Sequence, residues 1–277
     1  MNENPARPAK EDRHFVTALA RGMEVLACFR AGDRLLGNQE IAQRCRLPKS
    51  TVSRLTYTLT RLGYLNHVEE LGKYRLGVAT FALSSTMVAN LDVNDVAGPL
   101  MQELADFARA EVALGARDRL SMVYLVHCRS KDLHNRELRI GSRLPLAVTS
   151  MGRAWLAGCE PKDRDAVLRS LQDRRPRDWP RLSSEIDEAL QQHRRDGVTM
   201  VVGGWQAGIN AIARPLRLGS GRPLLSLSCG GPGFVLPPDY LLHSIRPRLI
   251  ELAARIETAM LRLPATAVRT RRAAGTT

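Results

Sequence analysis

The stretch PKSTVSRLTYTLTRLGYL, at residues 48–65, constrains the fold of this chain more than any other segment. Its apolar residues recur at helical spacing, although Ser and Thr, which are mediocre helix formers, fill many of the other positions. On a helical wheel one arc is apolar and is expected to face a core; it contains Val52, Leu55, Leu59 and Leu62. The opposite arc is polar; it contains Ser50, Ser53, Arg54, Tyr57 and Arg61.

No acidic residue occurs from position 48 to position 68, whereas a helix face that contacts only water usually carries paired Glu and Lys. Short hydroxyls allow close approach to phosphates and base edges, Arg can fork onto guanine, and Tyr can reach a phosphate or a thymine methyl group. The helix N-terminus adds a partial positive charge. The polar arc therefore predicts a DNA-recognition helix with Lys49 and Thr51 on its flanks. An exposed helix of a purely helical domain is the alternative.

The segments around this helix predict a small domain. A helix is expected from Phe15 to about Arg30, followed by a short helix, QEIAQRC, that Asn38 caps. The segment YLNHVEELGKYRLG is typical of a β-hairpin. Three helices and a hairpin are the outline of a winged helix-turn-helix. Its further expected DNA contacts are Asn38 and Gln39 on the short helix and Lys73 and Arg75 on the hairpin, which would be the wing.

The charge balance indicates the same partner. The chain of 277 residues has 41 Lys and Arg against 28 Asp and Glu, which gives a formal net charge of +13. A protein this basic usually binds phosphate, as nucleic acid or anionic lipid; a generally Arg-rich proteome is the plainer explanation. The length favours two domains, and an apolar fraction of 44% is ample for a core.

Other classes of protein lack support in the sequence. The polar first residues do not form a secretory signal, and no apolar run is long enough for a transmembrane helix, so a cytoplasmic protein is expected. The five cysteines are scattered without a CxxC pair, which favours reduced thiols and no metal site. No GxSxG, P-loop or HExxH motif occurs. We therefore expect no enzyme activity and no cofactor.

The second half alternates helical and extended segments. A helix at 78–90 links the halves, a second runs from about Asn94 to Ala108, and a third begins at Thr149 or Ser150. Strands are expected at 112–118, 121–129, 136–141, 198–204, 209–216 and 223–230, and a loop is expected at 176–181. Two further helices are expected at 183–197 and 238–261, and the second of them should be divided or kinked at Pro247. This order suggests a single antiparallel sheet flanked by helices.

The chain resembles the IclR family of bacterial transcriptional regulators over about residues 13 to 262. The segments that carry the resemblance are RGMEVLACF (21–29), NQEIAQRCRLPKSTVSRLTYTLTRLGYL (38–65), KYRLG (73–77), GSRLPLAVTSMGRAWLAG (141–158), GINAIARPL (208–216) and LLSLSCGGP (224–232). The resemblance implies a two-domain α+β protein, in which a linker helix joins the winged helix-turn-helix to a GAF-like antiparallel sheet domain that binds a small effector. The expected parts are a disordered tail (1–12), the DNA-binding domain (13–77), the linker helix (78–92), the effector domain (93–262) and a basic disordered tail (263–277).

The same resemblance implies an effector pocket. Carried over position by position, its residues are Leu144, Ser150, Met151, Ala211, Ser226 and Ser228. The helix start at Ser150 offers N–H groups to a carboxylate, while the two serines can equally be ordinary polar residues of a strand. Many relatives carry acids where this chain has VVGGWQA (201–207). We therefore expect an aromatic or other organic acid, with Trp205 as a stacking wall unless it belongs to the core.

These features lead to one hypothesis of function. Two chains pair through the first helix and the linker, so that two recognition helices enter successive major grooves of a pseudo-palindromic operator. An effector then shifts the spacing of the two DNA-binding domains and controls a catabolic operon. Repression and activation are both compatible with the sequence, as are a dimer and a tetramer. The alternative is a constitutive DNA-binding protein whose second domain serves only oligomerisation.

Overall fold

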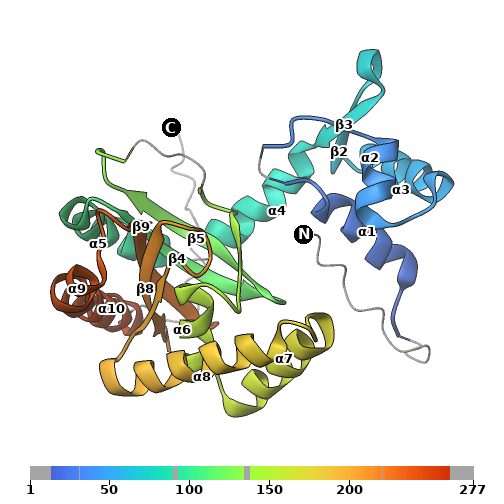
Figure 1. Ribbon diagram of the computed structural model, residues 1–277. Coiled ribbons are helices and arrows are strands. Elements are labelled where there is room, and N and C mark those ends of the chain that lie inside the picture. Colours follow the sequence, from blue (N-terminus) through green and yellow to red (C-terminus); the bar gives the residue numbers. More distant parts are fainter. Residues whose placement is uncertain (1–13, 31, 90–92, 134–137, 220, 263–277) are drawn as a thin grey trace, which may run out of the picture. The chain divides into compact units, whose positions relative to one another are not determined.

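The computed structural model describes residues 14–30, 32–89, 93–133, 138–219 and 221–262 (Figure 1). The two predicted tails, 1–12 and 263–277, lie outside the described residues. The chain divides into two compact units between Leu91 and Asp92, and each is described by itself. Among the described helices, none combines the length and hydrophobicity that a membrane span requires.

The first unit is a winged helix-turn-helix. Its helices are α1 (Thr17–Ala27), α2 (Asn38–Cys45) and α3 (Lys49–Arg61), and its small antiparallel sheet has the order β1 (Leu36–Gly37), β3 (Lys73–Leu76), β2 (Leu65–Val68). The 3₁₀ turn η1 (Glu69–Leu71) joins β2 to β3, and α4 (Val78–Ala89) follows. The core lies where the helices meet the sheet, around the fully buried Val25, Ile41 and Val52.

Two details of this unit differ from the sequence predictions. Leu62 was expected in the core but is 59% exposed, because it lies at the edge of the buried arc of α3. That arc is centred on Val52, Thr56 and Leu59, although the Leu62 N–H still donates to the Thr58 carbonyl (3.0 Å). Thr56 takes the inward position, and its hydroxyl donates to the Val52 carbonyl (3.0 Å). Asn38 is not a cap but the first residue of α2, since the carboxylate of Glu40 accepts from the Gly37 N–H (2.8 Å).

The second unit is an antiparallel six-stranded sheet covered by helices. The strand order is β6 (Arg143–Pro145), β5 (Ser121–Arg129), β4 (Glu111–Asp118), β9 (Leu225–Pro232), β8 (Ile209–Leu216), β7 (Thr199–Val202). The helices α5 (Val93–Ala108) and α10 (Arg246–Leu261) pack together against the sheet, and α6 (Ser150–Gly158) packs on β8 and on α8 (Trp179–Asp196). Helix α7 (Pro161–Arg174) lies between α6 and α8 in the chain, and the helical turn α9 (Pro238–Tyr240) precedes α10. The α+β class with two domains is confirmed.

Two local predictions for the second unit are revised, and a third is confirmed. The strand expected at 136–141 is instead β6, and residues 138–142 form no strand. Helix α8 begins at Trp179, inside the expected loop, because Pro180 near a helix start lacks only an N–H that would be unsatisfied there. The last helix is divided as expected, with a π-helical segment at Leu241–Ile245, because Pro247 cannot donate to the carbonyl four residues earlier.

Candidate nucleic-acid interface and ligand pocket

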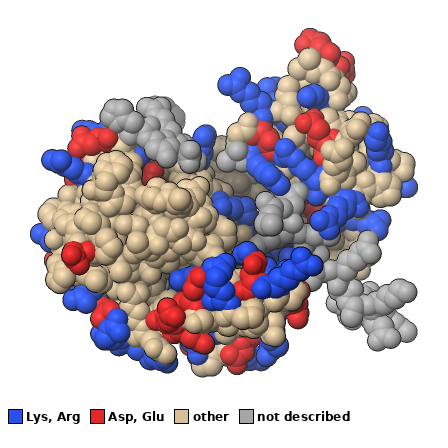
Figure 2. Space-filling model, in the orientation of Figure 1, with Lys and Arg blue, Asp and Glu red and all other residues tan. Residues whose placement is uncertain are grey.

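The polar arc of α3 is fully available for contacts. Its five predicted residues are all exposed, with Tyr57 at 66%. The guanidinium groups of Arg54 and Arg61 form no hydrogen bond or ion pair with any other described residue. In Figure 2 most charged side chains on the visible face of this unit are Lys and Arg. The arc therefore presents free cationic and hydroxyl groups outward.

Several hydroxyls of this segment have local partners instead. Thr56 is buried, and the Thr58 hydroxyl donates to the Arg54 carbonyl (3.0 Å), which is the usual back-bond of Thr within a helix. The Asn38 amide bridges the two helices: its Nδ2 donates to Ser53 Oγ (3.3 Å), and its Oδ1 accepts from Thr56 Oγ1 (3.3 Å). On the polar arc and its flanks, the hydroxyls without a partner among the described residues are those of Ser50, Tyr57 and the half-buried Thr51, while the Ser53 hydroxyl accepts from Asn38 and can still donate.

The remaining predicted DNA contacts border α3. Lys49 Nζ donates to Gln39 Oε1 (3.4 Å), and both side chains are exposed. On β3, Arg75 is exposed, while Lys73 Nζ lies 3.7 Å from Glu40 Oε2. The tip of the hairpin is acidic in Figure 2, over η1, which contains Glu69 and Glu70. A wing contact with phosphate therefore involves the strand rather than the tip.

The second unit contains a pocket on the face of the sheet that α6 covers. Strand register places Glu111, Ala113 and Gly115 of β4 on one face, opposite Gly230, Ser228 and Ser226 of β9 respectively. Most side chains on this face of the sheet are small, so space remains between the sheet and the helices that cover this face. The pocket has a volume of about 810 Å³, its open mouth included.

A β-bulge determines which residues of β5 face this space. Gly115 pairs with Tyr124 and Leu114 pairs with Val126, so Leu125 is an extra residue without a partner. Without the bulge, Tyr124 and His127 would point to opposite faces, because three positions separate them. With it, their rings stack with centroids 5.6 Å apart. Burial, and after it the charge of Glu111, raises the pKa of the Tyr124 hydroxyl above its usual range.

The N-terminus of α6 forms another wall of the pocket. Thr149 is the N-cap, and its Oγ1 accepts from the Gly152 N–H (3.2 Å) and donates to the Pro145 carbonyl (2.8 Å). The Ser150 carbonyl accepts from Thr199 Oγ1 (2.8 Å). Arg153, only 7% exposed, donates from Nε to the Ala147 carbonyl (2.9 Å) and pairs with Glu185 of α8. These contacts fix the direction of the first N–H groups of α6.

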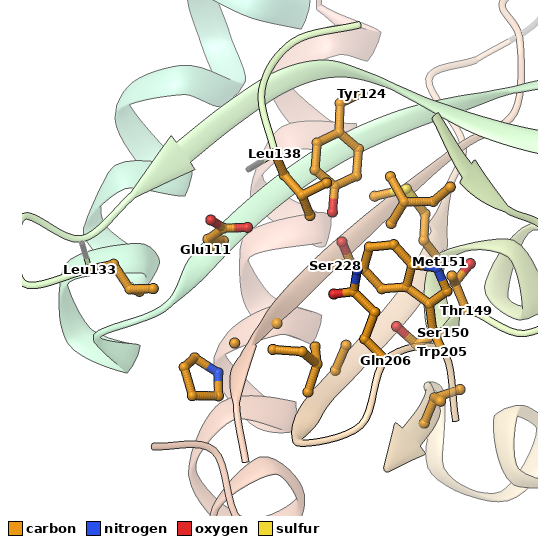
Figure 3. A pocket seen from close by; sticks show the side chains of 17 residues that line it. Glu111, Tyr124, Leu133, Leu138, Thr149, Ser150, Met151, Trp205, Gln206 and Ser228 are labelled. Carbon is orange, nitrogen blue, oxygen red and sulfur yellow. The ribbon is translucent and has the colours of Figure 1, made fainter. Parts of the chain in front are cut away.

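Most of the predicted effector residues meet in this pocket (Figure 3). Those that line it are Leu144, Ser150, Met151, Trp205, Ala211 and Ser228. Trp205 also packs against the hydrophobic cluster under α6. Ser226 is fully buried and does not line the pocket. Ser226 pairs with Gly115 of β4 and Pro215 of β8. Gly115 lies against Met151 of α6, and Pro215 lies against Gly158 of α6, so α6 covers this part of the sheet.

Sequence reasoning missed other lining residues. The polar ones are Glu111, Tyr124, Thr149 and Gln206, and the others are Leu133, Leu138, Val201, Ile209, Gly230, Gly231 and Pro232. The Glu111 and Tyr124 side chains reach the pocket through strand pairing and the bulge, which no local pattern shows. In the part of the chain that the structure describes, no group of three His, Cys, Asp or Glu residues is placed to hold a metal ion.

The ion pair behind α6 supports one prediction. Burial opposes the charge of Glu185, but hydrogen bonds from Arg181 and Arg153 outweigh it and hold the pKa of Glu185 below its usual value of 4.5. Glu185→Gln should lower the free energy of unfolding of this unit by about 1.5–3 kcal/mol at neutral pH. The difference should shrink as the pH falls below 4.5 toward the lower folded pKa, because protonation then removes the same charge from the wild type. Urea unfolding followed by tryptophan fluorescence measures it, since Trp155, Trp179 and Trp205 all lie in this unit. An equal difference at pH 7 and at pH 3 would contradict this account.

A winged helix-turn-helix with an exposed, acid-free recognition helix, together with a separate pocket that has polar and apolar walls, defines a ligand-binding transcriptional regulator. Comparison with known proteins identifies the family. Residues 18–69 match the IclR helix-turn-helix domain, and residues 85–258 match the family described as bacterial transcriptional regulator IclR C-terminal. The chain therefore belongs to the IclR family.

Individual relatives agree with this assignment. The HTH-type transcriptional regulator TsaQ1/TsaQ2 of Comamonas testosteroni is 32% identical over 249 residues, 89% of each chain. The crystal structure of an IclR family transcriptional regulator from Brucella abortus is 46% identical with a TM-score of 0.83, over 94% of this chain and 97% of that one. The family consists of regulators rather than enzymes, as the sequence predicted.

Proposed function

We propose that this regulator binds a pseudo-palindromic operator as a homodimer in the cytoplasm and changes its affinity for that operator when a small organic acid occupies the second unit. The observation that carries the proposal is the presence, in one chain, of an unpaired basic recognition face and a separate pocket with polar and apolar walls. A polar-lined cavity favours a sensor, whereas a constitutive protein with an oligomerisation domain needs no such space.

The DNA contacts follow from the exposed face of α3. Arg54, Tyr57 and Arg61 are long enough to reach base edges in the major groove, and the serines allow the helix to approach closely. Lys49, Gln39 and Arg75 border this face and are assigned to phosphates, which fix the position of the unit but carry no sequence information. Asn38 acts mainly by holding α2 and α3 together.

Self-association is supported by apolar side chains that the first unit leaves exposed. Phe15, Leu19 and Met23 recur at a spacing of four along α1 and its start and are 43%, 64% and 54% exposed. On α4, Val78 and Phe81 are 82% and 72% exposed. Contiguous exposed apolar residues of this kind mark interaction sites. Pairing through these helices gives a two-fold dimer with two recognition helices for two half-sites.

The acid is assigned to the α6 end of the pocket. The backbone N–H groups of Ser150 and Met151 are in the first turn, where a helix binds anions well, and hydroxyls of Ser150 and Thr149 lie beside them. Trp205 and the leucines of the opposite wall then cover the apolar body of the ligand. Occupation of this end is expected to shift the population of dimer geometries that fit the operator.

One experiment tests the whole proposal. The protein is used to select binding sites from a random duplex library, and the selected operator is titrated with and without acids found by a thermal-shift screen. We expect an inverted repeat, and we expect each acid that raises the unfolding midpoint to change operator affinity by about 5- to 150-fold. A selected motif without an inverted repeat would contradict the dimer. Acids that bind without changing operator affinity would favour the constitutive alternative.

A further inference from the structure

The end of the pocket opposite α6 has its own chemistry. Figure 3 shows Glu111 and Leu133 on the opposite side of the pocket from Thr149 and Ser150. Glu111 stands at the start of β4, and its side chain is only 15% exposed. The pocket thus has a carboxylate at one end and the N-terminus of a helix at the other, with mainly apolar walls between them.

The Glu111 carboxylate retains free acceptor positions. Its Oε2 lies 3.5 Å from His127 Nε2, a side chain that is itself 10% exposed. A carboxylate can accept about four hydrogen bonds. Among the described residues, His127 Nε2 is the one polar atom that an ion-pair distance links to the Glu111 carboxylate. His127 Nε2 is buried without a hydrogen-bond partner among the described residues, so this contact is not a well-formed bond. A buried carboxylate with unused acceptors is costly unless a donor reaches it.

The described pocket walls form no hydrogen bond with the Glu111 carboxylate. The Gln206 carboxamide and the hydroxyls of Tyr124 and Ser228 nevertheless line the same pocket (Figure 3). The buried hydroxyl of Tyr124 faces Ser228, and the charge of Glu111 raises its pKa. No Lys or Arg lines the pocket among the described residues. A ligand group that enters this end therefore meets a carboxylate with free acceptors, beside His127 and without a Lys or Arg among the described lining residues.

We infer that Glu111 makes the pocket selective for organic acids that carry a hydroxyl or amino donor at the end remote from their carboxylate. The inference rests on the proposed function and specifies the class of effector. The carboxylate of such a molecule lies at the N-terminus of α6, and its donor satisfies Glu111. A dicarboxylic acid of the same length is disfavoured, because its second carboxylate would face Glu111. An unsubstituted acid leaves Glu111 without a donor.

Two short series of acids test the inference on the wild-type protein. The aromatic series is benzoate, 3- and 4-hydroxybenzoate, 4-aminobenzoate and terephthalate; the aliphatic series is hexanoate, 6-hydroxyhexanoate and adipate. In titration calorimetry, a donor-bearing acid of at least one series should bind about 10-fold or more tightly than its parent, which is the expected gain from a hydrogen bond to a charged group. The dicarboxylate of that series should bind most weakly.

Variants locate the effect. Glu111→Gln should reduce the preference for the donor-bearing acid and strengthen binding of the dicarboxylate, because the carboxamide can donate. Glu251→Gln is the matched control: it removes one acid from the same unit at an exposed position outside the pocket, and the preferences should not change. The wild-type series needs no variant to fold and can contradict the inference alone.

The outcomes separate the two proposals. Equal affinities for donor-bearing acids and their parents, or a preference that survives Glu111→Gln, overturn the selectivity but leave an acid-binding pocket. Failure of every acid in both series to bind, up to millimolar concentration, overturns the organic-acid effector and the selectivity together.

Discussion

Replacing Gly152 by alanine is expected to destabilise the second unit by about 3 kcal/mol, the upper part of the usual range for overpacking, and to abolish binding of acids. A Cβ atom at this position would lie 2.0 Å from the Leu146 carbonyl oxygen and 2.5 Å from its Cα. These are backbone atoms, so the contact cannot be relieved by a rotamer change. Alanine is a better helix former than glycine by only about 1 kcal/mol, which is too little to offset the clash. Tryptophan fluorescence during urea unfolding measures the loss.

The control for this prediction is Gly98→Ala in α5. It makes the same chemical change inside a helix, but a Cβ atom there has no neighbour within 4 Å apart from the residues next to it in the helix. This variant should stay within about 1 kcal/mol of the wild type, because the helix preference for alanine is offset by the crowding of a new Cβ against the ring of Pro99, and acid binding should be unchanged. Operator binding should persist in Gly152→Ala, because the first unit has its own core. Wild-type stability and acid affinity in Gly152→Ala would show that α6 does not lie against Leu146.

Local periodicity accounts for what was predictable in the fold. The spacing of Val52 and Leu59 was sufficient to place α3, and Gly63, with a φ of 76°, ends it as a helix stop should. The three-residue strand β6 was not predictable, because a segment this short has no period to detect and exists only through its pairing with β5. Leu62 was misplaced because the apolar residues alone put the centre of the buried arc too far toward Leu55 and Leu62, whereas the structure buries Thr56 on the other side of Val52.

Local sequence patterns predicted the pocket residues less well than the helices and strands. Ser226 and Ser228 are equivalent on a strand diagram, yet α6 covers one and leaves the other at the pocket, a difference that depends on the contact of Met151 with Gly115. Glu111 was invisible as a site residue because its position depends on pairing with β9, more than one hundred residues away in the chain. Family resemblance supplied five of the 17 lining residues, namely Leu144, Ser150, Met151, Ala211 and Ser228, whereas the acidic end came from the structure.

Arg54→Ala is expected to weaken operator binding by about 1–3 kcal/mol, roughly 5- to 150-fold, and to relax specificity at one base pair of each half-site. The guanidinium group is exposed on α3 and has no partner among the described residues, so its removal leaves no buried charge behind and should not alter folding. The measurement is a gel-shift titration of the selected operator and of variants in which each base pair is changed in turn.

The companion variants decide whether Arg54 contacts a base or only a phosphate. Arg75→Ala on the wing should weaken all operator variants equally and lower the slope of log affinity against log salt by about one, as loss of a phosphate contact does. Arg169→Ala, on the exposed face of α7, removes the same charge from the second unit and should change neither specificity nor slope. If Arg54→Ala weakened every operator variant equally, Arg54 would be a phosphate contact like Arg75. Base recognition would then belong to Tyr57, Arg61 and the serines, because these are the remaining exposed polar groups of the α3 arc.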